Sequence, residues 1–249
     1  MQVGLIGAGN MAGALARGWR RPVLVSDPVA ERARALAQEL GGEALDSNLE
    51  VARRAELVVL AHKPAQLAEV ASEIAPAASA VASILAATPL SALHDAYGAV
   101  PVFRFLPALP VEVRGGAVVK AADPAGPGGE LETAVRALFG ELGELVELED
   151  RLVDVAMGLM SCAPAYVALV AEAQVDAAVR RGLPAAEASE LVCATLAGTA
   201  ELLRSRGYDT LALRREVSSP GGLTARGLDA LERGGVRAAF SDALDAVLD

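Results

Sequence analysis

The stretch that decides the fold is VGLIGAGNMAG, residues 3–13. A short apolar run leads directly into G-x-G-x-x-A, which predicts a buried strand, a glycine turn and the start of a helix. Gly7 permits the tight turn, and Gly9 lets the backbone approach a bound pyrophosphate closely. Ala12 and Gly13 allow the helix to pack on the strand, and its N-terminus offers free N–H groups to an anion. The stretch therefore predicts a dinucleotide-binding site.

An acidic residue follows at the expected distance. The apolar run 23–25 ends at Ser26-Asp27, about twenty residues downstream, where an acid that binds a ribose 2′-hydroxyl is expected. A carboxylate there repels a 2′-phosphate, so Asp27 favours NADH over NADPH. Arg32 and Arg34 are nearby positive charges that would instead favour the 2′-phosphate of NADPH. The motif alone leaves open a glycine turn in an α/β protein that binds no nucleotide.

Composition bounds the class of protein. The chain has 249 residues, long enough for one large or two medium domains. Apolar residues make up 53% but aromatic residues only 3%, so the core is built of Ala, Val and Leu. The net charge of -10 argues against non-specific binding to nucleic acid or to an anionic membrane.

Other sequence signals concern location, thiols and metals. We find no charged leader with an apolar segment and no uninterrupted apolar run of about eighteen residues, so we expect a cytoplasmic protein without a membrane span. Cys162 and Cys193 lie in apolar helical patterns and are expected to be reduced and buried. His62 and His94 stand apart from other ligating residues, so we expect no metal site.

The first part of the chain alternates between two kinds of pattern. Alternating strands and helices predict a doubly wound, mostly parallel sheet with helices on both faces, here a dinucleotide-binding domain over 1–150. The predicted strands are 2–7, 22–26, 56–61, 80–85, 101–105, 116–120 and 144–148. The predicted helices are 11–19, 28–40, 65–74, 90–96 and 129–142.

The pattern becomes all-helical in 151–249. We predict helices over 150–181, with Pro164 inside it, and over 185–205, 224–233 and 235–248. The long helices are apolar nearly all round and must be buried. We therefore expect a second subunit to cover them; a compact monomeric bundle is the alternative.

Two loops follow predicted strands, where ligands lie in open α/β sheets. His62-Lys63-Pro64 follows the apolar run 57–60, so Lys63 either faces a cofactor or is a solvated charge. Arg104 precedes Leu106-Pro107-Ala108-Leu109-Pro110, a stiff loop suited to border a nicotinamide ring or to form a structural turn. Arg104 itself either helps to bind the cofactor or braces this loop.

A second anion site is predicted in the helical half. Ser218-Ser219-Pro220-Gly221-Gly222-Leu223-Thr224 precedes a short helix, and its glycine pair can curl into a nest of N–H groups. Such a nest fits a small carboxylate, and Ser219 and Thr224 add hydroxyl donors. An ordinary N-cap turn is the alternative.

These motifs together resemble the pyrroline-5-carboxylate reductases, the last enzymes of proline biosynthesis. The most specific matches are APAYVALVAEAQVDAAVRRGLP and VSSPGGLTARGLDALERGGVRAAF, at 163–184 and 217–240. Further matches lie at 4–15, 62–64 and 103–107. The resemblance implies a Rossmann domain followed by a helical dimerisation domain. It implies hydride transfer from NAD(P)H to the C=N bond of a cyclic imine carboxylate.

The resemblance also implies site residues. Ser219 and the backbone at Gly221, Gly222 and Leu223 would hold the substrate carboxylate, and Thr224 would direct its hydroxyl at the ring nitrogen, so Thr224 and Ser219 are the expected catalytic residues. The cofactor-binding residues expected in this way are Gly7, Gly9, Asn10, Met11, Ala12, Asp27, Asn48, His62, Lys63, Pro64, Arg104 and Pro107.

The chain departs from the family pattern at several positions. Leu106-Pro107-Ala108-Leu109-Pro110 stands where Met-Pro-Asn-Thr-Pro is usual, His62 where an aliphatic residue is usual, and Ala86-Ala87 where Ala-Gly is common. Leu223 replaces a frequent Thr. These departures leave two alternatives open, a reductase of a related cyclic imine or carbonyl compound and a catalytically silent NAD(P)-binding paralogue. A carbonyl dehydrogenase would be expected to carry a Lys in 150–181, which contains none.

Overall fold

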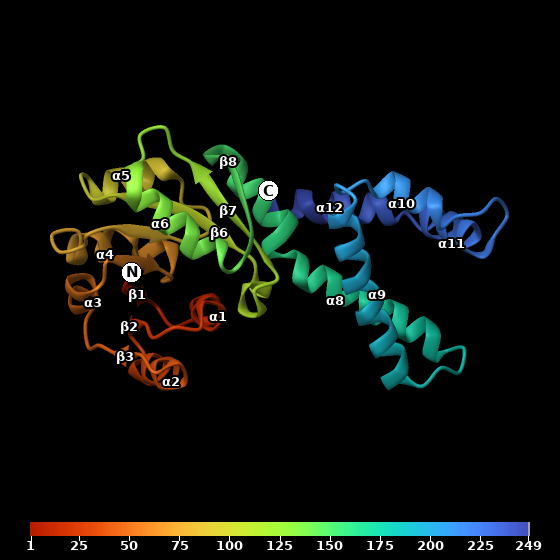
Figure 1. Cartoon of the computed structure of the whole chain (residues 1–249), viewed down its shortest axis with the longest axis horizontal. Coiled ribbons are helices and arrows are strands. Elements are labelled where there is room, and N and C mark those ends of the chain that lie inside the picture. The colour runs from red at the N-terminus through yellow and green to blue at the C-terminus, as the bar shows by residue number, and fades with distance from the viewer. Residues whose placement is uncertain (249) are drawn as a thin grey trace. The chain divides into compact units, whose positions relative to one another are not determined.

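The computed structural model describes residues 1–248 and divides into two compact units, Met1–Pro164 and Ala165–Asp249. The first unit is a twisted sheet with helices on both faces, and the second is built of helices (Figure 1). The predicted fold class is confirmed. The first unit extends beyond residue 150 because Val153 and Ala156 are buried against the sheet.

Eight strands form one sheet in the order β3-β2-β1-β4-β5-β6-β7-β8. All neighbouring strands are parallel except β6 and β7, which pair antiparallel. The strands are β1 Val3–Ile6, β2 Leu24–Ser26, β3 Glu43–Ala44, β4 Leu57–Leu60, β5 Val81–Ser83, β6 Val102–Pro107, β7 Gly116–Ala122 and β8 Gly143–Glu149. The doubly wound, mostly parallel sheet predicted from the alternation is therefore present.

Helices cover the sheet in two layers because successive strand residues point to opposite faces. One face carries α1 Asn10–Trp19, α2 Ala30–Leu40 and α6 Gly129–Gly140. The other carries α3 Asn48–Arg54, α4 Leu67–Ile74, α5 Leu90–Tyr97 and α7 Val153–Ala156. Short 3₁₀ turns lie at η1 Pro64–Gln66, η2 Leu109–Val113 and η3 Asp150–Leu152.

The prediction missed β3 and α3. Strand β3 has two residues and α3 has seven, so neither is long enough to show a hydrophobic period. The local signal for α3 is its cap, because the Ser47 side chain accepts a hydrogen bond from the Glu50 N–H at 3.1 Å.

Four aromatic side chains, including Phe103, lie in the core on the α1 face, and three of them make the closest ring contacts. Phe105 stacks on Phe139 with ring centroids 3.8 Å apart, and Trp19 meets Phe139 edge-on at 5.5 Å. The indole N–H of Trp19 donates to the Leu138 carbonyl at 2.9 Å. A chain poor in aromatic residues thus concentrates three of them where α1, α6 and β6 meet.

Helix α1 approaches its neighbours through Gly18. A Cβ at Gly18 would clash with the Val111 carbonyl oxygen of η2, whereas the atoms nearest to a Cβ at Gly13 belong to the Arg17 side chain of the same helix and lie at 3.3 Å or more. The role given to Gly13 in close packing against the strand is therefore wrong, and Gly18 is the residue that permits close approach.

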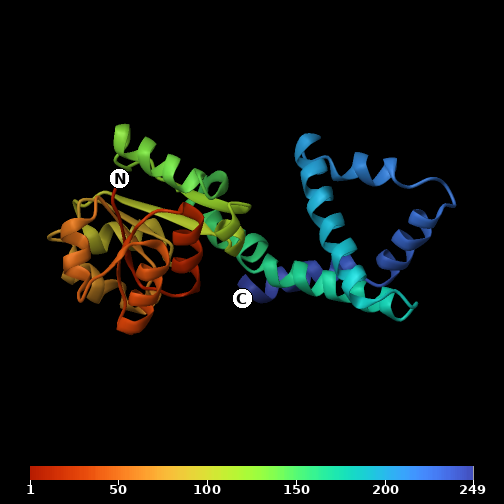
Figure 2. The same ribbon diagram turned by 60° about the horizontal axis from the view of Figure 1, so that its bottom comes forward.

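The second unit contains long helices with few buried residues. Its helices are α8 Ala163–Val179, which begins at the junction, α9 Ala185–Ser205, α10 Thr210–Glu216, α11 Leu223–Arg233 and α12 Val236–Leu248 (Figures 1 and 2). The short α10 was not predicted. Within this chain α8 has no buried residue over its described length, although its sequence is largely apolar.

The predicted helix over 150–181 is interrupted. It passes from η3 through α7 into a π-helical turn, η4 Met157–Ser161, before α8 begins. Pro164 lies in the first turn of α8, where its missing N–H leaves no helical hydrogen bond broken. The break therefore falls just before the proline.

One sequence expectation, that both cysteines are buried, needs correction. Both cysteines are free, but Cys193 is exposed and Cys162 is half-buried, because neither packs into a core within one chain. One helical segment, Asp150–Val179, is long and apolar enough to cross a membrane by length and composition, which the search for uninterrupted apolar runs did not reveal.

Candidate functional site

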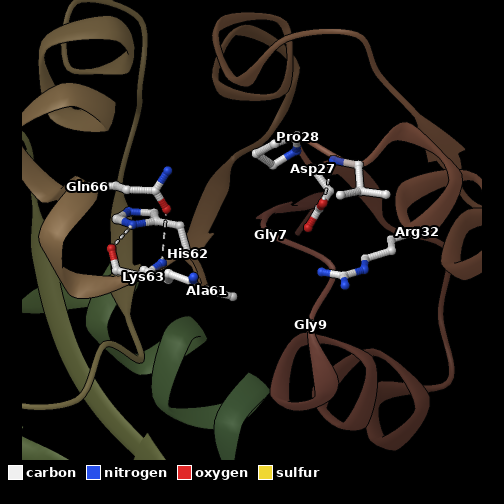
Figure 3. A pocket seen from close by; sticks show the side chains of 10 residues that line it. Gly7, Gly9, Asp27, Pro28, Arg32, Ala61, His62, Lys63 and Gln66 are labelled. Carbon is white, nitrogen blue, oxygen red and sulfur yellow. Dashed lines mark hydrogen bonds between the residues drawn. The ribbon is translucent and has the colours of Figure 1, made fainter.

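A cavity of about 410 Å³ lies at the carboxyl ends of β1, β2 and β4 (Figure 3). It is the position at which an open α/β sheet binds its ligand. The cavity is lined by Gly7, Gly9, Asp27, Pro28, Val29, Arg32, Ala61, His62, Lys63 and Gln66. Five of these residues belong to the predicted cofactor-binding set.

The glycine turn has the backbone that its sequence predicts. Gly7 adopts a φ of +104°, and its N–H donates to the Ser26 carbonyl at 2.8 Å. A Cβ at Gly7 would lie 2.6 Å from the Ala61 carbonyl oxygen, whereas a Cβ at Gly9 would meet nothing within 4 Å. Gly9 caps α1 without a side-chain partner, so the first N–H groups of the helix remain available to an anion.

Asp27 is tied to the glycine turn. Its Oδ2 accepts from the Ala8 N–H and its Oδ1 from the Val29 N–H, each at 2.8 Å. The carboxylate is therefore held at the edge of the cavity, and each oxygen keeps a lone pair that can accept a ligand hydroxyl.

A neighbouring cavity of about 200 Å³ continues from Asp27 and is rich in acids. The Asn48 amide donates to Glu73 at 2.8 Å, and the Ser26 hydroxyl donates to the Asn48 amide oxygen at 2.8 Å. The lining residues are Ser26, Asp27, Pro28, Asp46, Ser47, Asn48 and Glu73. Sequence reasoning named Asp27 and Asn48 here but missed Asp46 and Glu73, because acidic residues on a loop and a helix give no motif.

Arg32 brings a positive charge to the main cavity. It lines the main cavity and another of about 220 Å³ beside the N-terminal half of α1. Figure 3 shows its guanidinium directed into the main cavity. Arg17, which lines the smaller cavity, is engaged by Glu39 at 2.6 Å, and this hydrogen bond lowers the pKa of the Glu39 carboxyl.

The His62-Lys63-Pro64 turn is held by local hydrogen bonds. His62 Nδ1 lies 2.9 Å from the Lys63 carbonyl oxygen, an arrangement that favours the tautomer with a proton on Nδ1 (Figure 3). His62 Nε2 is buried without a hydrogen-bond partner among residues 1–248, and burial lowers the pKa of the imidazole. Lys63 is exposed, and its N–H donates to Gln66 Oε1 at 3.3 Å. The turn thus places a neutral imidazole and an ammonium group at the cavity.

Arg104 and Pro107 lie on β6. The Arg104 guanidinium is buried and contacts Asp150 and Asp154, so the structure favours bracing over contact with a cofactor. The Pro107 carbonyl accepts a hydrogen bond from Ser161 in the π-helical turn at 3.3 Å. Sequence reasoning missed Ser161, and its irregular helical turn has no sequence motif.

The predicted anion turn lies in the second unit. Gly221 adopts a φ of +69°, the Gly222 N–H donates to the Ser219 carbonyl at 3.0 Å, and Gly222 caps α11 without a side-chain hydrogen bond. Thr224 is exposed in the first turn of α11. The turn thus offers free N–H groups and hydroxyls to a small anion.

Within residues 1–248 we find no group of ligating side chains that could hold a metal ion.

Two family models match the chain. Residues 150–249 match pyrroline-5-carboxylate reductase dimerisation, and residues 2–87 match NADP oxidoreductase, coenzyme F420-dependent. The first corresponds to the helical half with its anion turn, and the second to the glycine turn and the strands around it.

Curated relatives align over nearly the full length. Pyrroline-5-carboxylate reductase 3 of Macaca fascicularis is 36% identical, covering 98% of this chain and 93% of the relative. Pyrroline-5-carboxylate reductase of Thermus thermophilus is 37% identical, covering 99% and 95%.

Solved structures of pyrroline carboxylate reductases resemble this chain over nearly its full length. The Plasmodium falciparum pyrroline carboxylate reductase with NADP bound has a TM-score of 0.87 at 26% identity, covering 99% of this chain and 95% of that one. The Streptococcus pyogenes 1-pyrroline-5-carboxylate reductase has a TM-score of 0.89 at 27% identity, covering 100% and 97%. The chain belongs to the pyrroline-5-carboxylate reductase family.

Proposed function

We propose that this protein reduces the C=N bond of 1-pyrroline-5-carboxylate to give L-proline, with NAD(P)H as the reductant. The observation that carries the proposal is the full-length similarity to reductases of this name, at 36% and 37% identity. When bound, the reduced nicotinamide supplies the hydride that the imine carbon accepts. The remaining work of the protein is to bind, orient and donate hydrogen bonds.

The residues of the first unit fit a dinucleotide. The Gly7 turn, the open face of Gly9 and the uncapped N-terminus of α1 would receive the pyrophosphate. Asn10, Met11 and Ala12 continue from this turn into the helix. The Lys63 turn would border the same molecule from β4.

The residues of the second unit fit the substrate. Ser219 and the N–H groups at Gly221, Gly222 and Leu223 would hold the carboxylate. Thr224 would place its hydroxyl at the ring nitrogen and stabilise the charge change there. In this proposal 1–150 is the cofactor domain and 151–249 the substrate and dimerisation domain.

We propose that a second copy of this chain covers α8 in a homodimer or larger homo-oligomer. Exposed apolar residues on α8 include Val167 at 50% and Leu169 at 64% of their surface. The match to a dimerisation family over 150–249 supports this occupant over lipid for the same apolar segment. Light scattering on the purified protein tests the proposal, and we expect the mass of a dimer or larger oligomer. The mass of a monomer, together with partitioning of the protein into anionic lipid vesicles, would contradict it.

We propose NADH as the preferred cofactor. Asp27 stands where an acid accepts the ribose 2′-hydroxyl, and Asp46 and Glu73 add negative charge to the adjoining cavity. One of the two N–H donors of the Asn48 amide is already used by Glu73, which leaves one for a ligand. Arg32 and Lys63 are cations that line the main cavity, whereas the residues that line the adjoining cavity include three carboxylates and no cation.

The first experiment is turnover of pyrroline-5-carboxylate by the pure protein, with NADH and NADPH in parallel. Proline formation with a higher kcat/KM for NADH supports both proposals. Proline formation with NADPH preferred overturns the cofactor proposal alone. Tight cofactor binding without turnover overturns the reaction and favours another imine or a silent paralogue, with the altered loop at 106–110 as the first place to examine.

A further inference from the structure

One buried charge has no part in the proposed chemistry. The Arg104 side chain lies on β6 with 1% of its surface exposed. A buried guanidinium needs both charge compensation and hydrogen-bond acceptors, because an unpaired buried charge is strongly destabilising. The identity of its acceptors therefore shows what the residue holds together.

Both acceptors come from the segment directly after β8. Arg104 Nη1 donates to Asp150 Oδ1 at 2.7 Å and to the Asp150 carbonyl at 3.2 Å. Arg104 Nη2 donates to Asp154 Oδ1 at 2.6 Å. The two nitrogens of one planar group thus contact η3 and α7, a fork that a lysine ammonium cannot reproduce.

Asp150 extends the contact to a third element. Its Oδ2 accepts the Leu90 N–H at 3.0 Å, at the first residue of α5. The residue before it is Pro89, which offers no side-chain cap, so Asp150 satisfies this helix end from elsewhere in the chain. One carboxylate thus joins β6, η3 and the start of α5.

A second contact lies further along β6. Ser161 of η4 donates its hydroxyl to the Pro107 carbonyl at 3.3 Å, at the last residue of the strand. Segment 150–161 therefore holds β6 at Arg104 and at Pro107. The same segment opens the region that matches the dimerisation family. The altered segment 106–110, which we place beside the cofactor, comprises the last two residues of β6, Ala108 and the start of η2.

We infer that Arg104 is a positioning residue: through Asp150 and Asp154 it holds segment 150–161 on β6 and so sets the position of the 106–110 loop. The role rests on the proposed function, because the loop matters to turnover only if it borders the reacting ring. Arg104 itself contacts no ligand in this scheme. Its loss is expected to lower kcat much more than the affinity for the cofactor.

The experiment compares Arg104→Lys and Asp154→Asn with Arg151→Gln as the matched control. Arg151 lies in the same segment and pairs with Glu149 at the end of β8, but both side chains are largely exposed, at 72% and 67%. Asp154→Asn removes charge from one acceptor and leaves Asp150 in place, so it is the milder variant if Arg104→Lys folds poorly. We would measure kcat, KM, the Kd for NADH and amide hydrogen exchange of the purified protein.

We expect kcat to fall about tenfold or more in Arg104→Lys and severalfold in Asp154→Asn, with the Kd for NADH changed less than about threefold. Amide exchange rates should rise selectively in residues 105–111, while the exchange rates in β1 and β4 should equal those of the wild type. In the double variant Arg104→Lys/Asp154→Asn, kcat should fall by less than the product of the two single effects, because both substitutions weaken the same interaction. Arg151→Gln should match the wild type.

Two results would overturn the inference. One is a wild-type kcat with unchanged exchange at 105–111 in folded Arg104→Lys and Asp154→Asn. The other is an exchange increase spread evenly over the sheet, which indicates general destabilisation. If the wild type itself shows no turnover, the proposed function fails, and the exchange pattern still decides whether Arg104 positions the loop.

Discussion

The Asp27 carboxylate and the Ala8 N–H are joined by a hydrogen bond of 2.8 Å, which ties the end of β2 to the glycine turn after β1. The contact orients the carboxyl group at the cavity before any ligand arrives. Because the backbone sets its position, the choice between two cofactors can be altered at this side chain without rebuilding the turn.

Asp27→Ser is expected to shift the preference toward NADPH. Serine keeps one acceptor for the Ala8 N–H but removes the charge that repels a 2′-phosphate. We expect the ratio of kcat/KM for NADPH to that for NADH to rise on the order of tenfold, or about 1.4 kcal/mol. Glu31→Gln, at an acid that lines none of the cavities described above, removes the same charge and should leave the ratio unchanged. An unaltered ratio in Asp27→Ser would refute the assignment.

Gly7→Ala and Gly9→Ala should separate folding from binding. At Gly7 the positive φ and the Ala61 carbonyl oppose a methyl group, so we expect a loss of about 1–3 kcal/mol in the free energy of unfolding. Gly9 has room for a methyl group, so its variant should melt within about 2 °C of the wild type without cofactor. Its affinity for NADH should nevertheless fall at least about tenfold, because the methyl group occupies the path of the pyrophosphate. Calorimetric melting and NADH titration measure the two effects, and a Gly9→Ala protein that binds normally would contradict the placement.

Thr224→Ala should lower kcat/KM while cofactor binding survives. Loss of one hydroxyl donor at the reacting nitrogen is expected to cost about 2–4 kcal/mol of transition-state stabilisation. Thr224→Ser retains the hydroxyl and serves as the control, with activity near that of the wild type. A wild-type rate in Thr224→Ala would discard the assigned role.

His62→Val should change how stability depends on pH. Burial lowers the pKa of His62 in the folded protein, so below the ordinary histidine pKa of about 6.5 the unfolded chain binds more protons than the folded one. The contribution of His62 to stability therefore falls as the pH drops through and below 6.5. The difference in unfolding free energy, wild type minus variant, should decrease between about pH 7.5 and pH 5 in urea titrations. His94 and the charges at Asp27, Arg32 and Lys63 are common to both proteins and cancel; a pH-independent difference would count against the buried neutral imidazole.

Ala87→Gly tests the departure from the usual Ala-Gly. Ala87 adopts a φ of +50°, a conformation that costs a residue with a Cβ roughly 1–2 kcal/mol, while glycine adds up to about 1 kcal/mol of entropy to the unfolded state. We expect a small net gain in stability, about 0.5–1 kcal/mol. Ala86→Gly is the matched comparison and should destabilise, since Ala86 has no positive φ. Equal effects of the two changes would argue against strain at Ala87.

Much of the dinucleotide-binding fold could be predicted from short stretches of sequence. In 3–13 the strand, turn and helix start are encoded by neighbouring residues, and the structure reproduces them with Gly7 at positive φ. The two-residue β3 and the seven-residue α3 were missed because they are too short to show a period. The turn at 218–224 before α11 was likewise visible as a pair of glycines ahead of a helix.

By itself the sequence determined the alternation of strands and helices, the glycine turn, the acid after β2 and the family, because each depends on residues that are close along the chain. Only the tertiary structure decided which residues meet. Arg104 contacts acids that lie 46 and 50 positions away, and Asp27, Asp46 and Glu73 gather from separate elements around one cavity. Hydrophobic periodicity tells which face of an element is buried, but the partners of a buried charge depend on how the elements pack.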